Sequence, residues 1–320
     1  MTVPLWMWAA TLAAIVAMLA VDLFAHRRAH EITVPRAAAW SAVWLALGTG
    51  FGAVVWAAWG TERAGEYFAG YLIEKSLAVD NIFVFALIFS AFAVPRAYQH
   101  RVLFFGVLGA LVMRAAFIAG GAALLERFHW VLYGFGVFLL ITAWRMIRSH
   151  GHADPRGSRP MRLVQRVIPA VADYQGQRFW VRRAGRLAAT PLLVVLVLVE
   201  ISDVIFAVDS IPAIFAVTQQ PFLVFTSNAF AILGLRSVYF LLADLMHRFV
   251  YLKQGLAAVL LLVGLKMLLA DLIHIPVFAW LAMIAGCLAV AIWASLRATR
   301  DPVKDLDRDQ RSPERDGVLR

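Results

Sequence analysis

The chain has 320 residues, of which 62% are hydrophobic and only 16% charged, and its mean hydropathy is +0.75. A soluble core cannot bury so many apolar side chains, so this composition excludes a water-soluble globular protein and predicts that lipid surrounds the chain. A net charge of +10 is typical of nucleic-acid binding in soluble proteins, but here the basic residues separate apolar blocks and therefore indicate membrane topology. The single cysteine, Cys287, excludes a disulfide framework and a thiolate cluster for a soft metal.

Nine apolar blocks follow one another along the chain. Each is about 20 residues long, enough for a helix to cross a hydrocarbon core of about 30 Å, and few of them alternate as barrel strands would. The sequence therefore predicts an all-α fold, a polytopic transmembrane helical bundle of about nine spans. These lie near residues 4–25, 37–59, 66–93, 99–122, 128–147, 190–217, 222–244, 249–272 and 276–296. We expect one transmembrane transporter domain over 1–297 and a disordered cytoplasmic tail over 298–320.

Basic residues gather in alternate connections between the spans. Of the 30 Lys and Arg residues, 24 lie in or at the edges of the connections after spans one, three, five and seven or in the C-terminal tail. The intervening connections hold only Arg63 and Arg127. Because cytoplasmic loops are enriched in Lys and Arg, we predict a multi-pass protein of the cell inner membrane with its N-terminus outside and its C-terminus in the cytoplasm.

The longest basic connection covers about 148–188. It begins with His150 and His152, which have no Cys or carboxylate neighbours and are therefore more typical of a solvated loop than of a metal site. Apolar residues at helical spacing over 161–171 are compatible with a helix lying on the anionic inner leaflet, and equally with a solvated connector. After this connection, Thr190 as N-cap and Pro191 at the first helical position predict the start of a helix.

One motif occurs twice. Residues 77–85 read LAVDNIFVF and residues 206–215 read FAVDSIPAIF. An acidic residue comes six positions before the shared aspartate in each copy, and these pairs are Glu74 with Asp80 and Asp203 with Asp209. The copies lie in the third and sixth spans, an odd number of crossings apart, so they run in opposite directions. We therefore predict an inverted repeat relating spans three to five with spans six to eight, an architecture that places transporter substrates near the midplane.

Helical spacing groups the polar residues of the motif. Glu74 and Asn81 are seven residues apart and share one helix face. Asp203 and Ser210 repeat this spacing in the second copy, and Glu200 lies one turn before Asp203. Two helices are therefore expected to present oxygen atoms to one volume near the middle of the bilayer. Carboxylate and amide oxygens without Cys or His favour hard cations, namely Ca²⁺, Mg²⁺ or Mn²⁺.

Ten ionisable side chains lie inside the predicted spans. Each costs about 2.5–3.5 kcal/mol at the centre of a helix, more than packing would tolerate without a use. With every carboxylate ionised they leave an excess of two negative charges, which one divalent cation would neutralise. Asp22 is close enough to its helix end to touch water. The ten are Asp22, Glu74, Asp80, Glu200, Asp203 and Asp209 against Lys75, Arg114, Arg236 and Lys266, and we expect these four basic groups to balance the carboxylates as ion pairs.

Long stretches of the sequence resemble the TerC/Alx family of integral membrane proteins, over roughly residues 20–276. The family is associated with manganese efflux and metal homeostasis, and some members with tellurite resistance. Its intramembrane acidic residues are taken to form the cation path. The stretches are GYLIEKSLAVDNIFVF (70–85), QHRVLFFGVLGALVMRAAFI (99–118), TPLLVVLVLVEISDVIFAVDSIPAIFAV (190–217), FTSNAFAILGLRSVYFLL (225–242) and YLKQGLAAVLLLVGLKMLL (251–269).

The resemblance implies a set of site residues, at which the sequence does not depart from the family pattern. The implied metal ligands are Glu74, Asp80, Glu200, Asp203 and Asp209. Asn81, Ser210, Asp22 and Asn228 are expected to support them.

Export of a divalent cation, Mn²⁺ before Ca²⁺, is the leading interpretation, with the cation and the lipid bilayer as partners and no permanently bound cofactor. Proton exchange is the natural drive, and a uniporter fits the residues equally well. No ATP-binding sequence GxxxxGK(S/T) occurs, so nothing in the chain would hydrolyse ATP. An intramembrane aspartyl protease would also use paired aspartates, but the GxGD type of motif is absent, and no enzyme is predicted. The alternative is a membrane scaffold in metal or tellurite stress, in which the charges only bind helices together.

Overall fold

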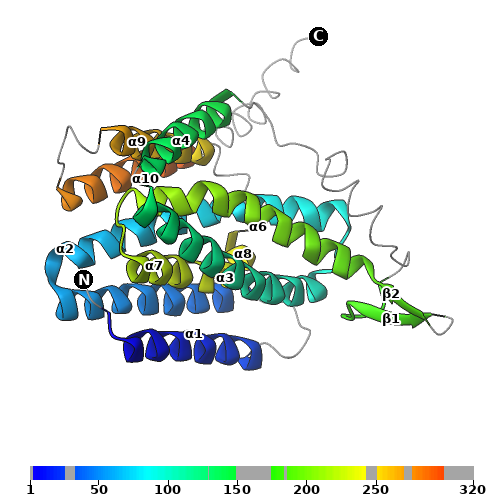
Figure 1. Cartoon of the computed structure of the whole chain (residues 1–320). Helices are drawn as coiled ribbons and strands as arrows, with labels where there is room; N and C mark the ends of the chain where they lie inside the picture. Colours follow the sequence, from blue (N-terminus) through cyan, green and yellow to red (C-terminus); the bar gives the residue numbers. More distant parts are fainter. Residues whose placement is uncertain are drawn as a thin grey trace, which may run out of the picture.

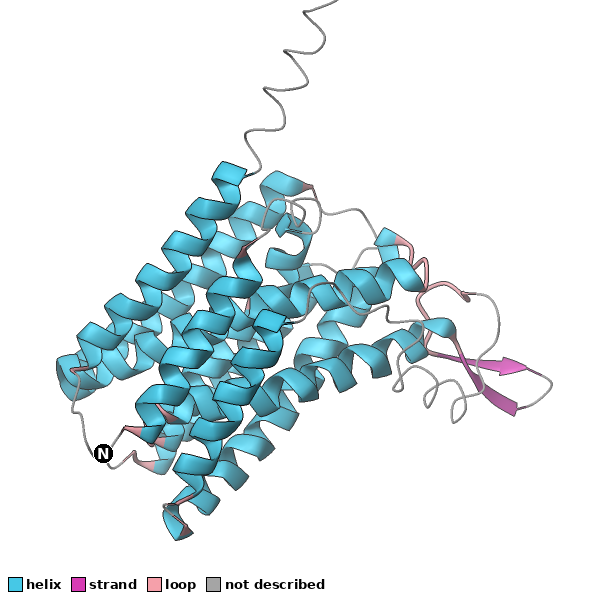
Figure 2. Ribbon diagram, turned by 90° about the horizontal axis from the view of Figure 1, so that it is seen from above, coloured by secondary structure: helices cyan, strands magenta, loops and turns pink. Residues whose placement is uncertain are grey.

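The computed structural model describes residues 3–25, 33–128, 130–148, 174–183, 186–242, 251–269 and 276–298. Within these ranges the chain forms a bundle of helices and one short β-hairpin (Figure 1). The hairpin projects away from the helices (Figure 2). The helices are α1 (Leu5–Ala25), α2 (Val34–Ala91), α3 (Arg96–Arg127), α4 (Val131–Arg148), α6 (Pro191–Phe215), α7 (Pro221–Leu233), α8 (Leu235–Leu242), α9 (Leu252–Leu268) and α10 (Val277–Ala298), and the strands are β1 (Trp180–Arg183) and β2 (Arg186–Ala189).

Each predicted span corresponds to a helix or to part of one, which confirms the polytopic helical bundle. Among the described residues, α1, α3, α4, α6 and α10 are each long and apolar enough to cross a membrane. The pair α7 and α8 meets the same test as one broken span, bent by 41°. Large apolar side chains on the outside of the bundle are exposed. For example, Val112 is 65% exposed and Val290 is 64% exposed. Such side chains are stable on the surface when lipid rather than water surrounds them.

Helix α2 contains the second and third predicted spans. It breaks at Gly60, whose φ of 82° and ψ of −177° lie in a region that only glycine adopts easily. The two limbs then pack against each other. The Tyr67 hydroxyl of the second limb donates to the carbonyl of Gly48 in the first at 2.8 Å. In an unbroken helix these residues would be about 28 Å apart. The second limb, residues 61–91, carries the first copy of the repeated motif.

The two halves of the predicted repeat pack reciprocally. The first half is the second limb of α2 with α3 and α4, and the second half is α6, the bent pair α7–α8, and α9. Helix α3 of the first half packs against α6 of the second, and in the same way α7 and α8 of the second half pack against α2 of the first. The first helices of the two halves, α2 and α6, contact each other, and so do the third helices, α4 and α9. Exchanging the halves leaves this pattern unchanged, in agreement with an inverted repeat. Helices α4 and α9 come closest at Gly136 and Gly264, where a Cβ on either would lie 2.9–3.1 Å from the carbonyl oxygen of the other.

The β1–β2 hairpin was not predicted, and it alters the account of the helix start that follows it. Its strands are antiparallel, with Trp180 opposite Ala189. Helix α6 begins at Pro191 with Thr190 at the N-cap, as predicted, but the Thr190 side chain does not cap it. The hydroxyl instead donates to the carbonyl of Arg178 at 2.7 Å. Thr190 therefore ties the hairpin to the beginning of α6.

Several predictions fall outside the described residues. These are the surface helix over 161–171, the pair His150 and His152, and the tail over 299–320. The orientation of the chain in the membrane stays a prediction.

Candidate cation site

Arg114 lies between two acidic residues, one from each half of the repeat. Its side chain comes from α3 and is 1% exposed. Nε and Nη2 donate to the two carboxylate oxygens of Asp203, both at 3.0 Å. Nη1 donates to Oε1 of Glu74 and, at 3.3 Å, to the hydroxyl of Ser210. Because the planar guanidinium matches a carboxylate with two parallel hydrogen bonds, this Arg114 cluster is a strong link between α2, α3 and α6.

Two oxygen atoms next to these contacts have no hydrogen-bond partner among the described residues. They are Oε2 of Glu74 and Oδ1 of Asn81, on side chains that are at most 1% exposed. The amide nitrogen of Asn81 donates to Oδ1 of Asp203 at 3.5 Å, which places Asn81 beside the cluster. Buried polar atoms are nearly always satisfied, so these two oxygens need an explanation such as a water or a cation.

Asn81 also lines a cavity of about 570 Å³, to which the two motif aspartates belong. Asp80 and Asp209 both line this cavity, and both are only partly buried. Asp209 accepts a hydrogen bond from the hydroxyl of Thr142 in α4 at 3.1 Å, and Arg145 of α4 lines the same space. The walls come from the second limb of α2, α4, α6 and α9, which are the first and third helices of each half. Among the described lining residues, Asp80 and Asp209 are the negative groups. The remaining lining is apolar and consists of Leu77, Phe138, Met146, Ile205, Phe206, Val208 and Leu260.

The five predicted ligands do not form one group. Among the described residues no three His, Cys, Asp or Glu side chains gather where they could hold a metal ion together. Glu74 and Asp203 are engaged by Arg114, whereas Asp80 and Asp209 share the cavity. Glu200 is partly buried and lies against α3, at a point where a Cβ on Gly109 would clash with its carboxylate. Arg114 occupies the space between Glu74 and Asp203, and the ligand role of each of the five residues stays a prediction.

The four basic residues expected to balance these charges behave differently from one another. Arg114 and Arg236 make ion pairs, and Arg236 donates through Nη2 to Oδ1 of Asp22 at 2.6 Å and to its backbone carbonyl at 3.1 Å. Asp22 is only 5% exposed, so the expectation that it touches water is wrong. Its carboxylate turns into the bundle toward α8 instead of toward the helix end.

The two lysines make no ion pair among the described residues. Lys75 donates to the carbonyl of Ala231 in α7 at 3.0 Å. The Lys266 ammonium lies 5.1 Å from the ring centroid of Trp280 in α10, a cation–π contact.

Sequence reasoning missed the neutral and basic partners in the cavity. Thr142 is an isolated polar residue in an apolar span, and Arg145 stands at a span edge, where its charge was counted as a topology signal. Only the packing of α4 against α6 brings Thr142 to Asp209. Conversely, the predicted supporting residue Asn228 is buried in α7 at 1% exposure and does not line the cavity.

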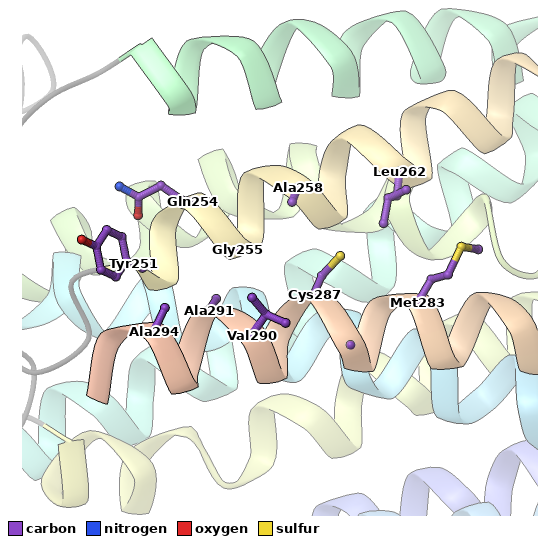
Figure 3. Close-up of a pocket in the computed structure, with 11 residues that line it drawn as sticks. Tyr251, Gln254, Gly255, Ala258, Leu262, Met283, Cys287, Val290, Ala291 and Ala294 are labelled. Carbon is purple, nitrogen blue, oxygen red and sulfur yellow. The ribbon is translucent and has the colours of Figure 1, made fainter. Parts of the chain in front are cut away.

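A second cavity, of about 680 Å³, lies between α9 and α10 (Figure 3). The residues that line it include Leu262, Met283 and Val290, and its polar members Tyr251 and Gln254 lie at one end. Among the described residues that line it there is no Asp, Glu, Lys, Arg or His. Its described lining is therefore apolar along most of its length and differs from the acidic lining of the first cavity.

The chain is similar to known integral membrane proteins. Residues 59–302 match the integral membrane protein TerC family. An uncharacterized membrane protein of Myxococcus xanthus is 51% identical over 94% of this chain and 95% of its own length. The Escherichia coli K12 protein Alx, whose name describes a candidate membrane-bound redox modulator, is 46% identical over 91% of this chain and 95% of its own length. No solved structure matches the chain.

Proposed function

This chain belongs to the TerC family of integral membrane proteins, and on that premise we propose that it is a secondary transporter that exports a divalent metal cation, Mn²⁺ before Ca²⁺, in exchange for protons. The single observation that carries the proposal is that Asp80 and Asp209, equivalent residues of an inverted repeat, line one cavity between the two halves. Substrate sites between inverted repeats are the rule among secondary transporters.

The chemistry of the cavity supports a hard divalent cation. Its charged oxygens come from Asp80 and Asp209, and neutral oxygens are available from Asn81 and Thr142. Such a set suits Mn²⁺, Mg²⁺ and Ca²⁺ better than Zn²⁺ or Cu⁺. Two carboxylates neutralise a divalent ion, and the same two groups can take up protons when the ion leaves, which couples the two fluxes. Mn²⁺ is placed first because of the resemblance to TerC/Alx proteins.

A membrane scaffold is the second candidate, favoured by the buried ion pairs of Arg114 and Arg236 with acidic residues of other helices. Those pairs account for Glu74, Asp203 and Asp22 by helix association alone. They do not account for Asp80 and Asp209, which line a cavity together and belong to none of these three buried pairs. A redox role, as in the name of the Alx relatives, has no dithiol to support it here, since Cys287 is the one cysteine of the chain. We expect no catalytic activity.

The proposal is tested by Mn²⁺ flux into vesicles that contain the purified protein, with an imposed proton gradient. Wild type is compared with Asp80→Asn and Asp209→Asn, which preserve shape and remove charge. Each substitution is expected to lower the flux by about tenfold or more, the effect of losing roughly 1.4 kcal/mol of cation binding. Glu126→Gln, which removes an exposed carboxylate near the end of α3, serves as the matched control and is expected to transport normally.

Competition by Ca²⁺ and Mg²⁺ in the same vesicles ranks the cations. Flux that is unchanged in both aspartate variants would remove the cavity from the pathway. Wild-type vesicles that move neither Mn²⁺ nor Ca²⁺ would overturn the transporter proposal and leave the scaffold.

A further inference from the structure

We propose that the guanidinium of Arg114 is an internal counter-cation, which holds Glu74 and Asp203 while the transporter is empty and is displaced when a divalent cation enters from the cavity. The inference rests on the proposed function and deepens it. It makes Arg114 the residue that sets how tightly the cation is bound.

The first argument is the position of the guanidinium. It contacts one carboxylate from each half of the repeat, Glu74 and Asp203, and both are almost fully buried. A divalent cation that joined the two halves would take the same carboxylate oxygens. Arg114 therefore occupies the place of a bridging cation, and the two cannot be bound to these oxygens at once.

The second argument is the set of oxygen atoms that Arg114 leaves unused. Oε2 of Glu74 and Oδ1 of Asn81 are buried and have no hydrogen-bond partner in the described part of the chain. A guanidinium donates in one plane and cannot reach ligands all around itself. A cation of six or more oxygen ligands can use atoms in every direction. The unsatisfied oxygens therefore fit the larger cation shell better than they fit Arg114.

The third argument is access. Asn81 lines the cavity of Asp80 and Asp209, and its amide nitrogen is 3.5 Å from Oδ1 of Asp203. The same side chain thus lines the cavity of Asp80 and Asp209 and contacts Asp203 of the Arg114 cluster. A cation in the cavity would therefore border a side chain that contacts Asp203.

The fourth argument is charge. With both carboxylates ionised, Glu74, Asp203 and Arg114 sum to −1. A divalent cation in place of the guanidinium neutralises the two carboxylates, and the displaced guanidinium keeps its own charge of +1. Both arrangements keep the buried carboxylates paired, which is the condition for their staying buried.

The repeat supplies a comparison within the same chain. Arg236, at the corresponding place of the second half, is held by Asp22 of α1. The carboxylate that Arg236 pairs with therefore comes from a helix outside the repeat, whereas Arg114 pairs with Glu74 and Asp203.

The test is Mn²⁺ binding to the purified full-length protein in nanodiscs, followed by the electron paramagnetic resonance signal of free Mn²⁺, together with thermal unfolding at several Mn²⁺ concentrations. If Arg114 fills the site more than nine-tenths of the time, its removal is expected to lower the apparent Kd by about tenfold. We therefore expect R114Q to bind Mn²⁺ about tenfold more tightly than wild type, and Mn²⁺ to raise its unfolding temperature more than that of wild type. A clamp with a purely structural role would not tighten Mn²⁺ binding.

Two controls sharpen the result. R236Q removes an equally buried arginine outside the site and is expected to keep the wild-type affinity. The double variant R114Q/D203N restores the charge of the cluster to its wild-type value and is expected to lose the gain. If R114Q does not fold, R114K replaces the planar fork by a single point charge and is expected to bind Mn²⁺ several times more tightly than wild type.

The outcomes separate the two proposals. Folded R114Q or R114K with unchanged or weaker Mn²⁺ binding overturns the role of Arg114 and leaves transport through Asp80 and Asp209 standing. Absence of Mn²⁺ binding in wild type and in every variant overturns both.

Discussion

Two neighbouring regions of this protein contain pairs of repeat-related carboxylates, yet they are in opposite states. In the Arg114 cluster, Glu74 and Asp203 are at most 3% exposed and share one guanidinium. In the cavity, Asp80 and Asp209 are partly open, and the hydrogen bond that Asp209 accepts comes from a neutral hydroxyl, that of Thr142. The same residue types from the same motif are thus closed in one place and open in the other.

The difference lies in the side chains that α3 and α4 bring to the two carboxylate pairs. The fourth span, α3, brings Arg114 into buried contact with one pair, and the fifth, α4, brings Thr142 and the exposed Arg145 to the cavity of the other. A buried carboxylate without a cation is strongly disfavoured, whereas a partly hydrated one is not. Burial and counter-ion, more than residue identity, therefore decide which carboxylates are held by Arg114 and which line the cavity.

The largest effect on the free energy of unfolding is expected when the arginine of the Arg114 cluster is removed. The comparison is the removal of an arginine at the cavity. Arg114→Gln should lower the free energy of unfolding by about 3–5 kcal/mol without metal, because it leaves two buried carboxylates uncompensated. Arg145→Gln removes an exposed arginine at the cavity and should change it by less than about 0.5 kcal/mol. Denaturation in detergent checks both. Equal stability losses would contradict the contrast between closed and open regions.

A somewhat smaller effect is expected at the second buried arginine. Asp22→Asn removes the carboxylate that Arg236 contacts at 2.6 Å and leaves the backbone carbonyl at 3.1 Å in place. Losing one charge-assisted hydrogen bond should cost about 2 kcal/mol in the free energy of unfolding. Thermal unfolding measures the loss, and Mn²⁺ affinity should stay at the wild-type value. A large change in that affinity would mean that α1 belongs to the site.

Next in size is the crossing of α4 and α9, which shapes the cavity walls. Gly136→Ala puts a Cβ about 3.1 Å from the carbonyl oxygen of Gly264 and should cost about 1–2 kcal/mol by overpacking. Gly134→Ala lies in the same helix with nothing within 4 Å and is the matched control, expected to be neutral or slightly stabilising. Thermal unfolding of the two variants decides. Equal behaviour would argue against a close helix contact.

The smallest effect is expected within the cavity itself. Thr142→Ala removes the hydroxyl that donates to Asp209, and the loss should be about 1 kcal/mol, or roughly fivefold in Mn²⁺ affinity. Thr142→Ser keeps the hydroxyl and should retain the wild-type affinity. Mn²⁺ titration in nanodiscs compares the two. Identical affinities for the alanine and serine variants would remove Thr142 from the site.

Several features could be read directly from the sequence. Apolar block length predicted where the helices lie, since a helix must satisfy its own backbone to cross lipid, although the second and third predicted spans form the one broken helix α2. The motif that occurs twice, with Asp80 in one copy and Asp209 in the other, predicted two halves of opposite direction. The structure brings these two residues to one cavity. Helical spacing also placed Glu74 and Asp203 correctly among the buried groups of the bundle.

Other features depended on which helices meet. Nothing along the chain says that Arg114 engages both Glu74 and Asp203 whereas Arg236 turns to Asp22, because these contacts join residues 40 to 214 positions apart. Composition and period act locally and therefore determined the helices, the repeat and the residue types available to a cation. Tertiary packing alone decided which carboxylates were closed by an arginine and which were left facing a cavity, since the energy of a buried charge depends on its nearest partners in space and not on its neighbours in sequence.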